Sequence, residues 1–272
     1  MACQVKIVAD SITPFGSRIT TFQLRYWRAI HSELMTHRVF SRNASSSRAI
    51  PVQKMIDQVL NDPAGPIHWG ANRPGMQATD QLHGLELAEA KEEWKRAAAS
   101  AVHHAKNMMA AGLHKQVANR ALEPWQYISV VLTATDFDNW YSLREHPAAM
   151  PEIFELASTM RAARDASCPR LLRPGDWHLP YVADADLDRG LRMRDLLRLS
   201  TARCARTSYN RHDGTPAPYD EDFELHDRLV MSEPRHASPA EHQAVALSSN
   251  RRVKNFTGWR QYRDFLERND EI

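Results

Sequence analysis

Apolar and polar residues alternate in two short segments near the beginning of the chain. Residues 4–10 and 18–25 show the two-residue period of half-buried strands, and the Pro-Phe-Gly triplet at 14–16 is typical of a turn. Residues 26–38 change to the longer period that marks one face of a helix. The pattern therefore predicts a strand, a turn, a second strand and a helix.

Helical patterns dominate the rest of the chain. A long helix is predicted from Thr79 to about Ala111, capped by Thr79 or Asp80 and ending near Gly112. The preceding residues, 62–78, hold three prolines and three glycines and are expected to form a loop. Shorter helices are predicted at 113–122, 126–145, 151–167, 191–206, 221–231 and 255–268, and 236–247 should lead from a loop into a helix or strand.

These elements predict an α+β fold in a single domain spanning residues 1–272. Its small, mainly antiparallel sheet should pack against several long helices. Apolar residues make up 43% of the chain and charged residues 25%, which is ordinary for a globular protein. No run approaches the ~18 apolar residues of a membrane span, and the start, MACQVKIVAD, lacks the features of a secretory signal. We therefore expect a cytoplasmic protein with no membrane contact.

Charge and cysteine usage exclude several other classes of function. The formal net charge of +2 gives no field that would favour nucleic acid as a direct partner. Cys3, Cys168 and Cys204 are too few and too scattered for a disulfide framework or a zinc site. The 13 histidines show no HExxH or similar spacing, so we expect no metal.

The segment from His37 to Arg48 carries the sharpest chemical signal. A predicted helix end presents an imidazole and a guanidinium to a hydroxyl-rich loop, which has another guanidinium at its far side. Small residues let backbone N–H groups approach an anion, and hydroxyl and guanidinium groups bind phosphate oxygens. A surface serine-rich loop is the competing interpretation. The segment is not a Walker loop, because GxxxxGK[ST] is absent.

Three further clusters combine polar and aromatic residues. They are Asn119–Trp125, Asp136–Arg144, and the pair formed by Ala202–Tyr209 and Arg235–His242. Taken alone, each of the first two is better explained as an exposed helix face. In the third, Ser238 and Glu241 have the spacing of a capping box, which predicts a well-capped helix whose N-terminus could bind phosphate or the polar edge of a flavin.

Together, the four clusters resemble the flavin-dependent thymidylate synthases. That family's signature reads Arg-His-Arg, two residues, Ser, one residue, Asn-Glu, one residue, Ser, one residue, Arg-Tyr. Its spacing is kept in this chain, and six of its nine positions carry the family's residue. The nine positions are Thr36, His37, Arg38, Ser41, Asn43, Ala44, Ser46, Arg48 and Ala49. The segments ANRALEP, NWYSLR, AMPEI, ARTSY and HASPAEH are similar to further family motifs. The resemblance covers roughly 20–60, 112–172 and 200–247.

The chain also departs from the family pattern. ARTSY and SPAEH follow the signature, whereas they precede it in the family, which resembles a circular permutation and is tolerable if the chain ends lie close together. Thr36, Ala44 and Ala49 replace an arginine, a glutamate and a tyrosine that help to bind flavin and nucleotide in the family. Such divergent relatives resemble bacteriophage proteins, which would act in the host cytoplasm.

The resemblance implies a fold, a reaction and an assembly. The fold would be that of the flavin-dependent thymidylate synthases, as a homotetramer with shared active sites. FAD, reduced by NADPH, would serve transfer of a one-carbon unit from 5,10-methylenetetrahydrofolate to C5 of dUMP, giving dTMP. No attacking cysteine is needed, in keeping with the absence of an activating setting around any cysteine.

Three alternatives stay open at this point. A flavin- and folate-dependent hydroxymethylase would make 5-hydroxymethylpyrimidine nucleotides from dUMP or dCMP, and the changes at Thr36 and Ala44 motivate it. A non-catalytic nucleotide-binding protein on the same scaffold comes second. A cysteine-dependent thymidylate synthase using Cys168 comes last, because nothing around that residue supplies the rest of such an enzyme's signature.

The resemblance also implies roles for individual residues, each a prediction to be compared with the structure. The pyrimidine deoxynucleotide would be held by Glu33, Ser46, Ser47, Arg48, Arg120 and Arg144. FAD would be lined by His37, Arg38, Ser41, Asn43, Asn139, Ser208, Ser238 and Glu241. The catalytic set would be Arg144 at the pyrimidine carbonyl, Ser46, and His236 near the flavin and folate.

Overall fold

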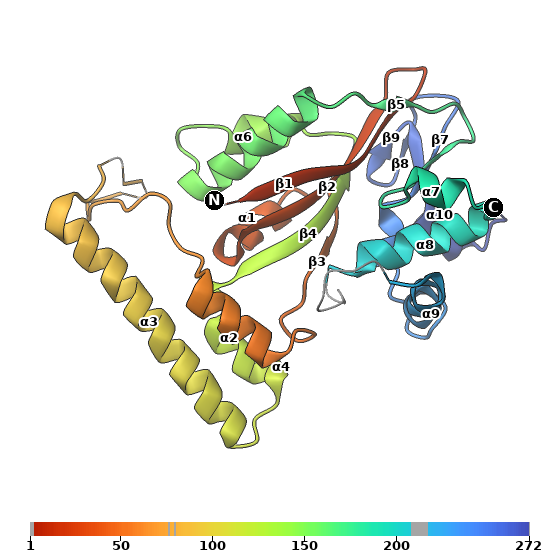
Figure 1. Cartoon of the computed structure of the whole chain (residues 1–272). Helices are drawn as coiled ribbons and strands as arrows, with labels where there is room; N and C mark the ends of the chain where they lie inside the picture. The colour runs from red at the N-terminus through yellow and green to blue at the C-terminus, as the bar shows by residue number, and fades with distance from the viewer. Residues whose placement is uncertain (1–2, 76, 79, 208–216, 272) are drawn as a thin grey trace.

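A five-stranded sheet forms the centre of the molecule. The computed structural model describes residues 3–75, 77–78, 80–207 and 217–271. The strand order is β3-β4-β2-β1-β5, and neighbouring strands are antiparallel except for the short parallel pair β1–β5 (Figure 1). The strands are β1 (Gln4–Ile12), β2 (Arg18–Trp27), β3 (Ser41–Ala44), β4 (Tyr127–Ala134) and β5 (Arg170–Leu171).

Helices of very different length surround this sheet. The α-helices are α1 (His31–Met35), α2 (Val52–Asn61), α3 (Gly84–Ala110), α4 (Lys115–Ala118), α5 (Asp138–Arg144), α6 (Pro151–Asp165), α7 (Asp184–Leu187), α8 (Met193–Ala205), α9 (Tyr219–Val230) and α10 (Tyr262–Arg268). The 3₁₀ segments are η1 (Arg28–Ile30), η2 (Asn119–Trp125) and η3 (Ser238–Glu241). The predicted α+β fold, with a small, mainly antiparallel sheet and several long helices, is confirmed.

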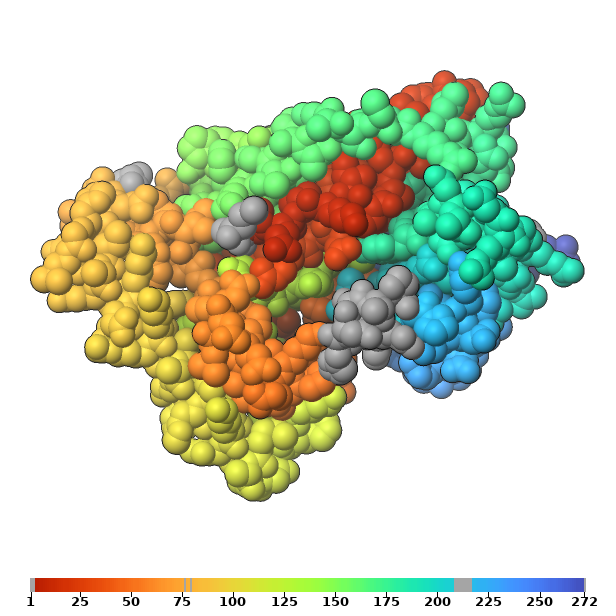
Figure 2. Space-filling model, in the orientation of Figure 1, coloured from red at the N-terminus to blue at the C-terminus, as the bar shows by residue number. Residues whose placement is uncertain are grey.

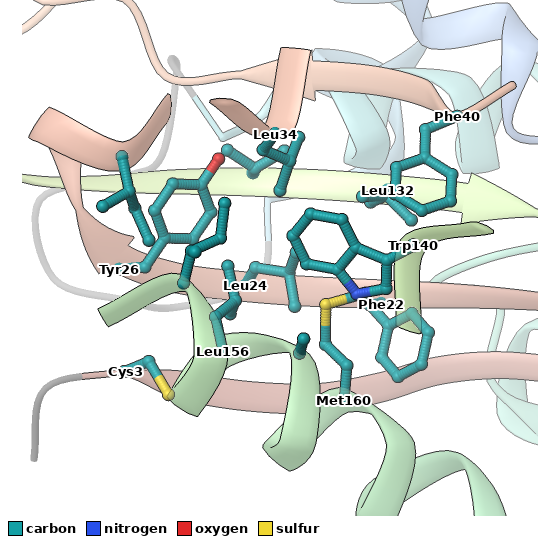
Figure 3. Close-up of a cluster of buried hydrophobic side chains, with 14 of the residues drawn as sticks. Cys3, Phe22, Leu24, Tyr26, Leu34, Phe40, Leu132, Trp140, Leu156 and Met160 are labelled. Carbon is teal, nitrogen blue, oxygen red and sulfur yellow. The ribbon is translucent and has the colours of Figure 1, made fainter. Parts of the chain in front are cut away.

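The main hydrophobic core lies on one face of the sheet. Side chains alternate along a strand, so Phe22, Leu24 and Tyr26 of β2 all point to this face. There they pack with Trp140 of α5, Met160 of α6 and further apolar side chains, all buried (Figure 3). This apolar layer holds α1, α5 and α6 against the strands and so fixes the position of the signature segment, which follows α1.

The opposite face of the sheet is polar at its centre. Thr21 of β2 and Thr133 of β4 are fully buried and hydrogen-bonded to each other, with 2.7 Å between their hydroxyl oxygens. Thr21 also bonds His178, and Thr133 bonds His242, each at 2.8 Å. Burial lowers the pKa of both histidines to about 3, so both are neutral in the folded protein.

The C-terminal part of the chain supplies this covering layer. Strands β6 (Trp177–His178), β7 (Ala244–Ala246) and β10 (Trp259–Gln261) form a second sheet in the order β10-β7-β6, and β8 (Arg252–Val253) pairs with β9 (Phe256–Thr257). Trp259 packs with Ile19 of β2, and α8 packs with α9 beside this layer. Residues far apart in sequence therefore meet across the central sheet.

Helices α2, α3 and α4 form a projection with its own small core. Met55, Ile56 and Val59 of α2 pack against Ala98, Val102 and other residues of α3. Most of α3 is exposed, and Figures 1 and 2 show the projection (orange to yellow-green) extending away from the C-terminal elements. Trp94 ties it to the body through an edge contact with Trp27.

The helix predicted at 126–145 is the largest error of the sequence interpretation. Residues 127–134 are β4, an inner strand of the sheet, and only α5 within that range is helical. The segment YISVVLTA is rich in β-branched residues, and six of its eight positions are buried. A strand covered on both faces shows no alternation, so its pattern resembles that of a buried helix.

Smaller corrections concern the ends of helices. The long helix begins at Gly84, not near residue 80, after the N-cap His83, and Thr79 lies outside the described residues. In the predicted 255–268 helix, only 262–268 is helical and the first half forms β9 and β10. The predicted capping box at Ser238 is wrong, because η3 has no side-chain cap and Glu241 pairs with Arg263 instead.

Other predictions on the organisation of the chain are confirmed or stay open. The first two strands, the turn between them, and the helices near 151–167, 191–206 and 221–231 are confirmed. The first and last described residues lie on different sides of the molecule (Figure 1), so the close chain ends that favour a permutation are not seen. Within the described ranges, no helix combines the length and hydropathy of a membrane span.

Candidate cofactor and nucleotide site

A cleft of about 380 Å³ joins the signature segment to the SPAEH segment. We call it the β3 cleft. Four of the residues predicted to bind FAD, Arg38, Asn43, Ser238 and Glu241, line it. Its other lining residues are His31, Met35, Phe40, Arg42, Ala44 and Asn255. The two motifs are far apart in sequence, and β3 meets η3 here.

Hydrogen bonds hold the segments around the β3 cleft together. The amide nitrogen of Asn43 donates to the carbonyl of Cys204 at 2.8 Å and to the hydroxyl of Thr207 at 3.0 Å, which ties β3 to the ARTSY segment. Ser41 is fully buried and accepts a hydrogen bond at 2.7 Å from Gln261. Ser208, another predicted FAD contact, lies outside the described residues.

Two arginines and one carboxylate line the cleft, and the carboxylate is already paired with another arginine. Arg38 is exposed and makes no hydrogen bond or ion pair within the described part of the chain. Arg42 donates Nη1 to the carbonyl of His37 at 2.8 Å, and burial lowers its pKa. The one carboxylate on the wall, Glu241, is already paired with Arg263. An anionic group would therefore find two guanidinium groups here.

His31 adds an uncharged imidazole to the same wall. Its Nδ1 lies 2.8 Å from the hydroxyl of the buried Tyr26. Burial, with Arg28 and Arg42 nearby, lowers the pKa of His31 to about 4. The donor set of two guanidiniums, the Ser238 hydroxyl and amide groups fits the pyrophosphate and polar ring edge of a flavin nucleotide.

A second group of predicted residues surrounds Arg144. Arg144 donates Nε to Nε2 of His37 at 3.1 Å and Nη1 to Glu33 at 2.7 Å. His37 is buried, and burial together with Arg144 lowers its pKa to about 4. Asn139, on α5 like Arg144, places its amide nitrogen 3.5 Å from Nδ1 of His37. The structure thus brings together Glu33, His37, Asn139 and Arg144.

A third group is organised by Glu123. One carboxylate oxygen, Oε1, accepts from the Ser47 hydroxyl at 2.7 Å and from Arg120 at 2.9 Å, and lies 3.1 Å from Arg28. Ser47 is buried and its hydroxyl donates to Glu123, whereas Arg120 is exposed to solvent.

The turn that precedes this group presents two further predicted residues. The Ser46 hydroxyl accepts from the backbone N–H of Arg48 at 3.3 Å, which shapes the turn. The Arg48 guanidinium is exposed and has no partner among the described residues. Asn119 supports the same turn by donating to the Ser47 carbonyl at 2.6 Å. Ser46, Ser47, Arg48 and Arg120 are thus gathered in one place.

The second and third groups lie at opposite ends of β3. The Arg144 group (Glu33, His37, Asn139 and Arg144) lies where the chain enters β3. The Arg48–Arg120 group (Ser46, Ser47, Arg48 and Arg120) lies where the chain leaves it. The four residues of this extended strand span about 10–13 Å of backbone. Within one chain, Arg48 and Arg120 thus belong to one group and Arg144 belongs to the other.

Some features of the site had no counterpart in the sequence interpretation. The cleft is also lined by Arg42, His31 and Asn255, and Gln261 bonds Ser41 behind it. Of these four residues only Arg42 lies within the signature, where it occupies a variable position. Conversely, the predicted catalytic His236 is exposed and does not line this cleft. Its backbone N–H bonds the carbonyl of Leu229 at 2.7 Å.

A larger cleft, of about 540 Å³, lies elsewhere. It is lined by residues of α2, the C-terminal end of α8, the start of β4 and α9, including Lys54, Arg206, Tyr127, Glu224 and Arg228. None of the predicted site residues lines it. Among the residues that the structure describes, no group of three or more His, Cys, Asp or Glu could hold a metal ion.

Comparisons with known proteins place the chain in a family. The crystal structure of the UMP/dUMP methylase PolB from Streptomyces cacaoi bound with 5-Br dUMP is 18% identical, with a TM-score of 0.50 over 59% of this chain and 89% of that chain. The same methylase bound with 5-Br UMP is 18% identical, with a TM-score of 0.46 over 59% and 88%. Curated protein sequences contain no match.

At this identity the likeness to PolB concerns the fold, which is that of the flavin-dependent thymidylate synthases. A sequence model of one family, described as thymidylate synthase complementing protein, matches residues 10–170, more than half of the chain. This chain therefore belongs to the thymidylate synthase complementing protein family.

Proposed function

We propose that this protein transfers a one-carbon unit from 5,10-methylenetetrahydrofolate to C5 of dUMP to give dTMP, using FAD and NADPH. Family membership supports the broader statement that the chain is a nucleotide one-carbon transferase. The observation that carries the finer proposal is the β3 cleft, where four predicted FAD contacts from two distant motifs line one space.

In this proposal the β3 cleft holds part of FAD. When bound, FAD would supply the redox chemistry of the transfer. Arg38 and Arg42 would face its pyrophosphate, because guanidinium groups bind such anions through charge-assisted hydrogen bonds. Ser238 and Asn43 would bond its polar edges. A cleft of about 380 Å³ is small for a dinucleotide, so the remaining part would extend beyond it.

The cysteines support a reaction without covalent attack by the protein. Burial raises the pKa of the Cys204 thiol and that of Cys3, so neither is a thiolate at neutral pH. Cys168 is exposed, and it is not among the residues that line the β3 cleft.

The nucleotide would bind across two protomers. Arg48 and Arg120 would bind the phosphate and Ser46 would donate to it, while Ser47 acts as a positioning residue through Glu123. Arg144 would polarise the pyrimidine carbonyl and Glu33 would hold Arg144. Since these groups lie at opposite ends of β3, a second copy of the chain would supply one of them to each nucleotide. This supports the proposed homotetramer with shared active sites.

A hydroxymethylase acting on dUMP or dCMP is the second candidate function. Ala44 lines the β3 cleft at the position where the signature has a glutamate. The shorter apolar side chain would leave room for a water molecule near the one-carbon group. Capture of that unit by water, in place of its reduction, would give a hydroxymethyl product.

Flavin uptake and product mass test both candidates. The purified protein is examined by absorption spectroscopy, then incubated with FAD, NADPH, 5,10-methylenetetrahydrofolate and either dUMP or dCMP. A product with the mass of dTMP supports the first proposal, and a hydroxymethyl nucleotide supports the second. A protein that takes up no flavin and leaves both nucleotides unchanged would rule out both, in favour of a non-catalytic nucleotide-binding protein.

A further inference from the structure

The C-terminal segment from Arg251 to Arg268 lies beyond the residues matched by the family model. It forms β8, β9, β10 and α10, and α10 packs against η3. One of its residues, Asn255, lines the β3 cleft, and another, Gln261, bonds Ser41 behind the cleft. Nothing in the signature or the SPAEH motif assigns a role to either.

Gln261 connects the two motifs that form the cleft. Its amide nitrogen donates to the Ser41 hydroxyl at 2.7 Å and to the backbone carbonyl of Glu241 at 3.0 Å. Only 2% of Gln261 is exposed, so water cannot replace these bonds. One side-chain nitrogen thereby sets the spacing between β3 and η3.

The backbone holds Gln261 in this position. In the β10–β7 ladder it lies opposite Ala244, and the N–H of the next residue, Tyr262, donates to the Gln243 carbonyl at 2.9 Å. The neighbouring Arg263 adds an ion pair to the Glu241 carboxylate. The backbone of the segment is therefore fixed beside β7, and the side chains of Gln261 and Arg263 contact η3.

Asn255 lines the β3 cleft itself. It follows Lys254, whose φ of 52° turns the chain between β8 and β9. Asn255 is half-buried, and its amide makes no hydrogen bond within the described ranges. Both its donor and its acceptor are therefore free to bind an occupant of the cleft.

We propose, building on the proposed function, that the C-terminal segment completes the flavin site. Gln261 is a positioning residue that sets the distance between the signature strand and the SPAEH turn. Asn255 is a further contact to the flavin nucleotide. A chain lacking these two side chains would keep Arg38, Asn43 and Ser238 but hold the walls of the cleft less firmly.

Equilibrium binding of FAD by the full-length apoprotein tests this inference without any turnover. Titrations followed by flavin fluorescence compare the unaltered protein with Gln261→Met and Asn255→Ala. We expect each variant to bind FAD about 10-fold more weakly, because Asn255→Ala loses one hydrogen bond to the ligand and Gln261→Met loses the bonds that hold β3 and η3 in place. Amide hydrogen exchange of the apoprotein should also become faster in β3 and η3 of Gln261→Met.

Two variants serve as matched controls. Gln126 is another buried glutamine that donates to a backbone carbonyl, that of Met55, at 2.8 Å, and it lies outside the β3 cleft. Asn250 is exposed and donates to the carbonyl of Phe15 at 2.9 Å. Gln126→Met and Asn250→Ala should bind FAD as the unaltered protein does and keep the normal exchange rates of β3 and η3.

The outcomes separate this inference from the function on which it rests. If the unaltered protein binds FAD and both cleft variants bind it equally well, the inference is overturned. If the unaltered protein itself binds no FAD, the proposed function is overturned instead. Should Gln261→Met fail to fold, Asn255→Ala decides alone, because Asn255 makes no hydrogen bond within the described residues.

Discussion

Arg144 and His37 are hydrogen-bonded, with Nε of the guanidinium 3.1 Å from Nε2 of the imidazole. An arginine N–H can only donate, so His37 accepts this hydrogen bond at Nε2. Burial and the neighbouring Arg144 lower the pKa of His37 to about 4. The histidine of the signature is therefore neutral at pH 7 and orients the arginine proposed to contact the pyrimidine.

Replacement of Arg144 by alanine should lower kcat with dUMP roughly 100-fold, the usual effect of removing one donor to a developing negative charge. Arg161→Ala, which removes an exposed arginine paired with Glu145, is the control and should leave kcat within about 2-fold. Steady-state kinetics measure both. Normal turnover by the Arg144 variant would exclude this arginine from the reaction.

Replacement of Arg120 by alanine should weaken dUMP binding about 10- to 100-fold, because a hydrogen bond to a charged group contributes ~1.5–3 kcal/mol. Arg120 is exposed and Glu123 already orients it, so the fold should be preserved. Isothermal titration calorimetry gives the dissociation constant. Arg96→Ala removes an exposed arginine on α3 as a comparison, and an equal affinity of both variants for dUMP would remove Arg120 from the site.

Thr133→Val should destabilise the protein by about 1–3 kcal/mol, the typical effect of leaving a buried polar partner unsatisfied. The Thr133 hydroxyl lies between Thr21 and His242, and valine has nearly the same shape but cannot hydrogen-bond. Urea unfolding measures the change. Ser100→Ala, on an exposed face of α3, should change stability by less than ~0.5 kcal/mol. A Thr133→Val protein of unchanged stability would contradict the buried bonding.

Stability should decrease below about pH 6.5. His178 and His242 have pKa values near 3 in the folded protein because of burial, whereas in the unfolded chain they titrate near 6.5. Their contribution is complete above pH 6.5 and is lost as the pH falls towards 3, since the unfolded state binds protons first. Each contributes a slope of up to about 1.4 kcal/mol per pH unit.

Urea unfolding at pH 8, 6 and 5 tests this dependence. The free energy of unfolding should be highest at pH 8, smaller at pH 6 and clearly smaller again at pH 5, because the histidines of the unfolded chain are already mostly protonated at pH 6. His178→Gln should flatten the curve, because it removes one of the two groups. Equal stability at pH 8 and 5 would contradict the prediction.

The sequence alone determined those features that depend on local pattern or on short motifs. The first two strands and their Pro-Phe-Gly turn follow from alternation, and the helix near 151–167 follows from its period, because such elements have one buried face. The spacing of His37, Arg38, Ser41, Asn43, Ser46 and Arg48 was enough to indicate the family, since motif spacing is a property of the chain itself.

Tertiary structure decided what depends on contacts between distant residues. The strand β4 was not predicted from the sequence, because a strand covered on both faces does not alternate apolar and polar residues. The bond from Gln261 to Ser41 joins residues 220 positions apart, which no local pattern can encode. Likewise, only the fold placed the Arg144 group and the Arg48–Arg120 group at opposite ends of β3, because the separation is set by the length of an extended strand and not by the spacing of the motifs.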